Sequence, residues 1–325
     1  MNEEHASPNP VIFMKTIISY FKDHYQKDVD LKLYLLVGLF WAIALIFNYQ
    51  LDFEDSVIDS YNRNPIIFLW YFLFYAYAYF GTVFIMIFYK RDWIWLRNWK
   101  FWIVSVVGLM ILALDIAFYH DLDIVQYFFP LEIHLYARRC FDRVVSLFTN
   151  VLPLFILWKI LKQPKNHFYG LRIKGANLKP YLWMILAISP LLLWASFQPD
   201  FLRQYPTYRA YGAPAYLEVS NWVTIFIYEI CYGIDFISIE LFFRGFLVIG
   251  IGSLIGKKAL LPMVVVYSFI HFGKPMGEAI SSVFGGYILG VIAFYSRHIF
   301  GGLIVHLGVA WLMDFFALLQ VYVWK

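Results

Sequence analysis

The stretch "IELFFRGF", residues 239–246, decides how this chain must fold. It places Glu240 and Arg244 four residues apart in an otherwise apolar run. On a helix this spacing puts both side chains on one face, where a carboxylate and a guanidinium can pair. A charge at the centre of a membrane helix costs about 3 kcal/mol on insertion scales, so such residues face a bundle interior and usually mark a site.

The composition of the whole chain indicates an integral membrane protein. Of its 325 residues, 62% are hydrophobic and only 15% are charged, and the mean hydropathy is +0.64. A water-soluble domain needs far more charge on its surface than this. Tyrosine and tryptophan are also abundant (25 and 12), as expected where aromatic rings lie at the level of the lipid headgroups.

Long apolar segments predict an all-α, polytopic membrane helix bundle. A spanning helix needs about 20 mostly apolar residues, and on this basis we expect about nine transmembrane helices. Their expected ranges are 32–50, 65–89, 101–119, 144–161, 180–196, 218–256, 259–273, 279–296 and 299–323. The range 218–256 is too long for one straight span, so we expect it to kink near Gly233, to break in two or to project from the bilayer.

Basic residues gather on one side of this expected map. They lie in the N-terminal segment, in 89–100, in 162–179, at Lys257–Lys258 and at Arg297, whereas loops such as 51–64 on the other side are acidic or lightly charged. The positive-inside rule then predicts a cytoplasmic N-terminus. Segment 120–143 is an exception with three arginines, and we interpret it as a surface or re-entrant helix.

The chain divides into three parts. Residues 1–31 resemble an amphipathic helix at the membrane surface, with Ile17, Ile18 and Phe21 on one side, and they lack the pattern of a cleavable signal peptide. Residues 32–217 supply generic apolar helices, and residues 218–325 carry most of the polar groups found inside apolar runs. The absence of an organelle signal and the charge pattern favour a bacterial inner membrane.

Two histidines accompany the Glu240–Arg244 pair in the last third of the chain. His271 lies in "YSFIHFGKPMGE" (267–278), and His306 lies in "GGLIVHLGVAWLMD" (301–314). Gly302 and Ala310 come one turn before and one turn after His306, so another helix can approach the imidazole closely.

A carboxylate and two imidazoles at membrane depth suggest hydrolysis. Glu240 can act as general base toward a water, and His271 and His306 can hold that water or stabilise an oxyanion. The same three side chains would also satisfy a catalytic zinc site with an open position. The sequence leaves both schemes open.

Each of these residues also has a purely structural interpretation. Glu240 with Arg244 is equally consistent with a buried structural pair, and a histidine in a membrane helix often only donates a hydrogen bond between helices. Tyr267 is a local neighbour of His271. Three acids belong either to the site or to helix ends near water, namely Asp235, Glu278 and Asp314. The cysteines, Cys140 and Cys231, lack a CxxC partner and are expected to act as small buried hydrophobes.

The order "ELFFRG", "YSFIH" and "GGYILGVIAFYSRHIFGGLIVHLGVA" resembles the CPBP family of intramembrane proteases, the CAAX endopeptidase and bacteriocin self-immunity group. The likeness covers about residues 218–323. It implies a helical membrane protein in which a glutamate activates water and histidines bind that water and stabilise the oxyanion. By this resemblance Glu240 matches the second glutamate of the motif, Arg244 its arginine, and His271 and His306 its histidines.

The chain departs from the family pattern at three positions. Ile239 stands where the first glutamate, the usual general base, is expected, Tyr267 replaces a phenylalanine, and Ala310 replaces an asparagine. Either Glu240 serves as base alone or the site is not hydrolytic. Glu278 is a possible substitute carboxylate.

Three functions therefore remain open from the sequence. The first is a membrane endopeptidase, the second is a non-catalytic binding, maturation or immunity protein on the same scaffold, and the third is a transporter that uses the ionisable groups as a proton relay. We expect a lipid bilayer and a polypeptide substrate as partners, and no nucleic acid. No cofactor other than zinc is suggested.

Overall fold

The computed structural model of the protein describes residues 10–162, 168–171 and 179–323. This part of the chain is 84% helical and contains no β-strand. Six of its helical segments are long and apolar enough to cross a membrane. They are Leu31–Leu51 (α2), Ile66–Lys90 (α3), Trp99–Ile116 (α4), Leu131–Ile160, Met276–Ser296 (α14) and Phe300–Tyr322 (α15). The all-α membrane bundle is therefore confirmed, whereas the predicted total of nine spans is not.

The second helix shows how the bundle meets lipid. Along α2, Leu35, Leu39 and Ile43 are exposed at intervals of four residues, so they form one apolar outer face. Val37 and Leu45 on the opposite face are buried against the rest of the bundle. An exposed apolar face of this length is suited to contact with acyl chains.

The span predicted at 144–161 begins much earlier than expected. Pro130, in an extended conformation, directly precedes it, and one helical segment then runs from Leu131 to Ile160. Its parts are Leu131–Ile133 (η4), His134–Val144 (α6), Leu147–Val151 (η5) and Leu152–Ile160 (α7). Segment 120–143 is thus not a single surface helix: Asp121–Phe128 forms the short α5, and the remainder extends the span.

The segment predicted at 218–256 is one helical run. It comprises Asn221–Glu240 (α11), Leu241–Gly250 (η6) and Ile251–Ile255 (α12). The helix continues through Gly233, and its irregularity lies in η6, where π-type hydrogen bonds replace the α-type. Such π segments occur often at functional sites because they redirect side chains locally. After Gly256–Ala259 (η7), the ten-residue helix Leu260–Phe269 (α13) is buried along its whole length.

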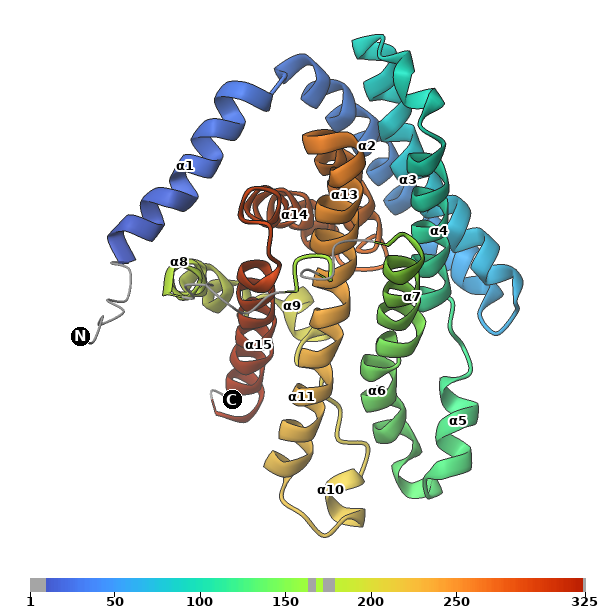
Figure 1. Ribbon diagram of the computed structural model, residues 1–325. Coiled ribbons are helices and arrows are strands. Elements are labelled where there is room, and N and C mark those ends of the chain that lie inside the picture. The colour runs from blue at the N-terminus through green and yellow to red at the C-terminus, as the bar shows by residue number, and fades with distance from the viewer. Residues whose placement is uncertain (1–9, 163–167, 172–178, 324–325) are drawn as a thin grey trace, which may run out of the picture.

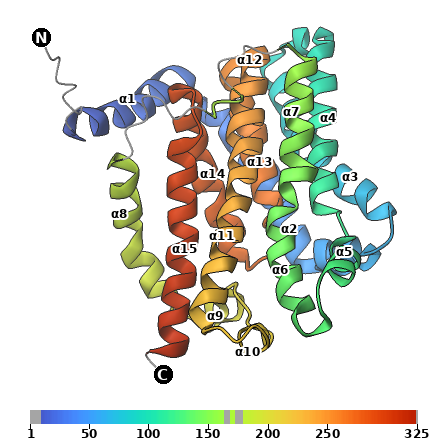
Figure 2. The ribbon, with the colours of Figure 1, turned by 60° about the horizontal axis from the view of Figure 1, so that its bottom comes forward.

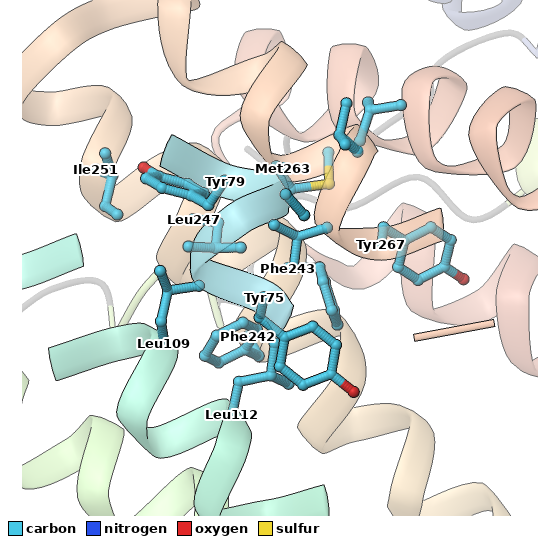
Figure 3. Packing of buried hydrophobic residues seen from close by; sticks show 14 of the residues in the cluster. Tyr75, Tyr79, Leu109, Leu112, Phe242, Phe243, Leu247, Ile251, Met263 and Tyr267 are labelled. Carbon is cyan, nitrogen blue, oxygen red and sulfur yellow. The ribbon is translucent and has the colours of Figure 1, made fainter. Parts of the chain in front are cut away.

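The largest core surrounds η6 (Figure 3). Phe242, Phe243 and Leu247 pack between Tyr75 of α3, Leu112 of α4 and buried side chains of α13. Gly108 of α4 permits this close approach, because a Cβ there would lie 2.1 Å from a ring carbon of Phe246. The helix that carries the "IELFFRGF" stretch is therefore at the centre of the bundle.

Helix α1 (Pro10–Asp28) lies crosswise over one end of the bundle in Figure 2, and Lys179–Ala195 (α8) lies along α15. Ile17 is buried against Tyr181 and Leu289, and Phe21 packs beside it, but Ile18 is exposed. That α1 lies at a membrane surface through these residues stays a prediction. The remaining short elements are Phe53–Ile58 (η1), Asp59–Tyr61 (η2), Trp93–Arg97 (η3), Pro199–Gln204 (α9) and Ala213–Tyr216 (α10).

Three lysine–aspartate pairs gather at the end of the bundle where α1 meets α2. Lys90 pairs with Asp30, Lys257 with Asp28, and Lys258 with Asp92 at 2.5 Å. The hydrogen bond from Lys258 lowers the pKa of Asp92. The segments predicted to share one side of the membrane thus meet at one end, except that most of 162–179 lies outside the described residues.

Candidate functional site

Glu240 and Arg244 lie where α11 passes into η6, and both side chains are fully buried. Arg244 Nη1 is 2.9 Å from Glu240 Oε1, so the spacing read from the sequence does produce an ion pair. The surrounding core is apolar. Because a buried charge is tolerated only when it is paired, each residue depends on the other.

His306 on α15 also binds the carboxylate of Glu240. Its Nδ1–H donates to Glu240 Oε1 at 2.8 Å. Gly302, one turn earlier, makes room for this contact, because a Cβ there would lie 2.4 Å from Glu240 Oε2. The absence of a side chain at Gly302 therefore allows α15 to approach Glu240 closely. The His306 ring also packs edge-on against Phe236, with centroids 4.5 Å apart.

Tyr267 on α13 connects the remaining groups. Its hydroxyl lies 3.1 Å from His306 Nε2, which accepts this hydrogen bond because the Nδ1 proton is directed to Glu240. The Arg244 guanidinium lies over the Tyr267 ring, 4.2 Å from its centroid, in a cation–π contact. Tyr267 thus adds a hydroxyl to this group of side chains.

His271 lies in the turn after α13 and does not contact Glu240 through a described hydrogen bond. Its Nδ1–H donates to the backbone carbonyl of Tyr267 at 2.7 Å, and the two rings pack with centroids 4.9 Å apart. Side chains of α2 hold this turn: Asn48 Nδ2 donates to the Phe272 carbonyl at 3.2 Å, and Tyr49 donates to the Lys274 carbonyl at 2.6 Å. His271 is therefore fixed beside the site with Nε2 as its remaining polar atom.

Several polar atoms of the ion pair keep hydrogen-bonding capacity. Glu240 Oε2, Arg244 Nε and Arg244 Nη2 are buried and have no hydrogen-bond partner among the described residues, and Arg244 Nη1 contacts Glu240 Oε1 as an ion pair without the geometry of a hydrogen bond. Buried charged groups normally use most of their capacity. These atoms are therefore the ones able to bind a polar group that enters the site. The His306 side chain, 18% exposed, is its most accessible member.

Glu278 stands apart from this group. It lies in the first turn of α14, where Lys274 Nζ is 2.6 Å from its Oε1 and the Tyr205 hydroxyl is 3.4 Å from its Oε2. Its carboxylate is thus engaged at the start of α14, which is one of the two places that the sequence left open for it. It is not in direct contact with Glu240 or His306.

The residues predicted for zinc do not form a metal-binding arrangement. Among the described residues, the group of acids and histidines with ligand atoms within 4.8 Å of one another is Glu54, Asp55 and Asp59. His306 directs one nitrogen to Glu240 and the other to Tyr267, and His271 directs Nδ1 to a carbonyl. Asp55 and Asp59 of this group are exposed and Glu54 is partly buried, and exposed acids often cluster without a metal. Burial raises the pKa of Glu54 to about 7.

A second polar cluster on α11 and α15 was only partly anticipated. Asp314 is buried and accepts hydrogen bonds from the backbone N–H and hydroxyl of Thr207, at 2.8 and 2.5 Å. Glu229 lies beside Asp314, and Arg143 of α6 pairs with Asp235 at 3.2 Å. The sequence singled out Asp235 and Asp314 but gave no sign of Thr207 or Arg143 as their partners, because these come from distant segments.

No protein-family model, no curated protein and no solved structure matches this chain.

Proposed function

We propose that this protein is an intramembrane endopeptidase that hydrolyses a peptide bond of a membrane-associated polypeptide. The observation that supports this function best is the meeting of Glu240, His306 and Tyr267 from three separate helices, with His271 packed beside them. A packing role alone explains this poorly, because burying so many ionisable groups is expensive in a membrane. The resemblance of the sequence to CPBP proteases is a second support for this proposal.

The contacts suggest a role for each side chain. Glu240 takes a proton from water at Oε2, and the water oxygen adds to the carbonyl carbon of the peptide bond. The same proton then passes to the leaving amine as the carbon–nitrogen bond breaks. His306 holds Glu240 in position through Nδ1, and Tyr267 fixes the tautomer of His306.

Two further groups complete this scheme. The unpaired N–H groups of Arg244 are donors of the kind that stabilise an oxyanion, and His271 Nε2 can accept a hydrogen bond from the attacking water. No step in this scheme requires a metal ion.

A second function is favoured by one observation. Glu240 has no exposed surface, and its Oε1 already binds both Arg244 and His306. Ile239, at the position of the family's usual base, packs among apolar side chains. A catalytically inactive membrane protein with maturation, immunity or binding functions would keep the same ion pair for stability.

We further propose that the protein lies in a bacterial inner membrane with its N-terminus in the cytoplasm. The support for this orientation is the lysine-rich end of the bundle, where Lys90, Lys257 and Lys258 meet. Tagging each end of the chain and testing protease accessibility in intact spheroplasts checks this assignment.

One experiment distinguishes a protease from a catalytically inactive protein. The purified protein is incubated with a peptide library in detergent, with and without a chelator, and cleavage is measured by mass spectrometry. Glu240→Gln, His271→Ala and His306→Ala are each expected to lower cleavage at least 100-fold, as removal of a general base or its partner does. Glu229→Gln, on the same helix, is the matched control and should cleave normally. If all four folded variants cleave as fast as the wild-type protein, the proposed mechanism is disproved.

A further inference from the structure

Helices α6 and α11 lie side by side and run in the same direction (Figures 1 and 2). Two side-chain contacts fix their register. Arg143 reaches Asp235 at 3.2 Å, and the Ser146 and Ser238 hydroxyls are 2.9 Å apart. Both contacts join residues that are 92 apart in the sequence. The two helices are therefore in step over this stretch.

The same register brings the two cysteines of the chain together. Cys140 lies one turn before Arg143, and a partner 92 residues further along the chain would be next to Cys231. The two thiol groups are close enough to interact directly. Tyr136, one turn before Cys140, donates to the Thr224 carbonyl at 2.8 Å, so contacts on both sides hold the cysteines in place.

The two helices approach each other closely near the cysteines. A direct hydrogen bond between two serine hydroxyls requires the backbones to approach closely, and a disulfide needs Cβ atoms about 3.5–4.5 Å apart. Both cysteines are free and only partly buried. The sequence, in which the two cysteines share no local motif, gave no reason to pair them.

We propose that Cys140 and Cys231 form a disulfide bond that ties α6 to α11. Two S–H bonds break, one S–S bond forms, two protons are released, and two electrons reduce an external disulfide to two thiols. Cys140 lies in the first half of Leu131–Ile160 and Cys231 in the first half of the run Asn221–Ile255, whose far end leads into Lys257 and Lys258 of the lysine–aspartate pairs. The orientation proposed above places the starts of both runs outside the cytoplasm, where disulfides persist.

The bond would constrain the helix that carries the candidate site. Cys231 precedes Glu240 by nine residues on α11, so a link at Cys231 fixes the outer half of this helix against α6. Reduction would leave the Arg143–Asp235 and Ser146–Ser238 contacts as the nearest connections between the two helices. The proposal concerns this link alone and does not require that the site be catalytic.

The test uses the purified full-length protein in detergent. One sample is treated with oxidised glutathione and a second with dithiothreitol, and each is then denatured in the presence of N-ethylmaleimide, digested and analysed by mass spectrometry. The oxidised sample is expected to yield a linked pair of peptides containing Cys140 and Cys231, without maleimide. The reduced sample should yield both peptides separately, each with one maleimide.

Single variants provide the matched control. In Cys140→Ser and in Cys231→Ser, the remaining cysteine should no longer appear in a linked peptide after the same oxidation. The proposal is overturned if the oxidised wild-type protein carries two maleimides per chain, or glutathione on either cysteine, instead of the linked pair.

Discussion

Helices α11 and α15 meet at two levels, and the two levels differ in how they treat a buried glutamate. At the inner level, Glu240 of α11 binds Arg244 and His306. At the outer level, Glu229 of α11 lies beside Asp314 of α15, which is another acid. The same pair of helices thus surrounds one carboxylate with cationic and imidazole groups, and the other with a second carboxyl group.

The contacts of the two levels point to different roles. Asp314 uses both oxygens to hold Thr207, and so fixes the segment before α10 against α15. At the inner level, Glu240 Oε2 and the three side-chain nitrogens of Arg244 have no hydrogen-bond partner among the described residues, and at the outer level the same holds for both carboxylate oxygens of Glu229. The difference is that the unpartnered atoms of the inner level belong to an ion pair, which suits the binding of a substrate, whereas Asp314 at the outer level is a saturated acceptor, which suits a structural anchor. We therefore expect changes at the inner level to have the larger effects.

The largest effect is expected from Glu240→Ala. This change leaves the fully buried Arg244 without its anionic partner, and breaking a buried pair in this way destabilises a protein by about 3–5 kcal/mol. The control is Glu229→Ala, which removes a partly buried carboxylate with no hydrogen bond to a described residue and should change stability by less than about 1 kcal/mol. Unfolding of both variants in detergent, followed by circular dichroism, measures the difference.

A double variant separates a lost ion pair from a simple loss of packing. If the unpaired guanidinium causes the instability, Glu240→Ala with Arg244→Leu should be more stable than Glu240→Ala alone. A double variant that is less stable than the single one would show that the charge of Arg244 is not the cause.

An intermediate effect is expected from Gly302→Ala. The added Cβ would lie 2.4 Å from Glu240 Oε2, so either α15 or the carboxylate must move, and overpacking of this kind costs about 1–3 kcal/mol. Gly285→Ala on α14 is the matched control, because no atom lies within 4 Å of its added Cβ. If the two variants unfold at the same temperature and retain equal cleavage, the close approach of α15 to Glu240 is not important.

The inner level could be predicted from the sequence because its key contact is local. Glu240 and Arg244 are one helical turn apart, and Gly302 beside His306 indicated a close helix approach. Glu240, Arg244 and His306 could therefore be predicted from the sequence alone. The outer level could not be predicted in this way. Arg143 reaches Asp235 across 92 residues, and Thr207 reaches Asp314 across 107, from segments whose own sequences show no periodic pattern for these contacts.

The predicted total of nine spans is not confirmed, for a related reason. A window of apolar residues cannot distinguish a helix that faces lipid from a helix buried by its neighbours. The ten residues of α13 are apolar because α3 and α14 cover them, and they are too few to cross a bilayer. The start of the span at Leu131 depends on Pro130, which directly precedes it. The sequence did not reveal this start, because the charged residues after Pro130 suggested a surface segment.

The smallest effect is expected from Thr207→Val at the outer level. This change removes the hydroxyl that donates to Asp314 Oδ2 at 2.5 Å but keeps the backbone N–H that donates to Oδ1, so Asp314 loses one of its two hydrogen bonds to Thr207. One such bond is worth about 1 kcal/mol, or somewhat more when the acceptor is charged. Thr82→Val is the control, because the Thr82 hydroxyl bonds only to a carbonyl of its own helix, and it should lower stability by a smaller amount. If Thr207→Val reduced cleavage as strongly as Glu240→Gln while leaving the unfolding temperature unchanged, the outer level would belong to the functional site, and the division between anchor and site would have to be abandoned.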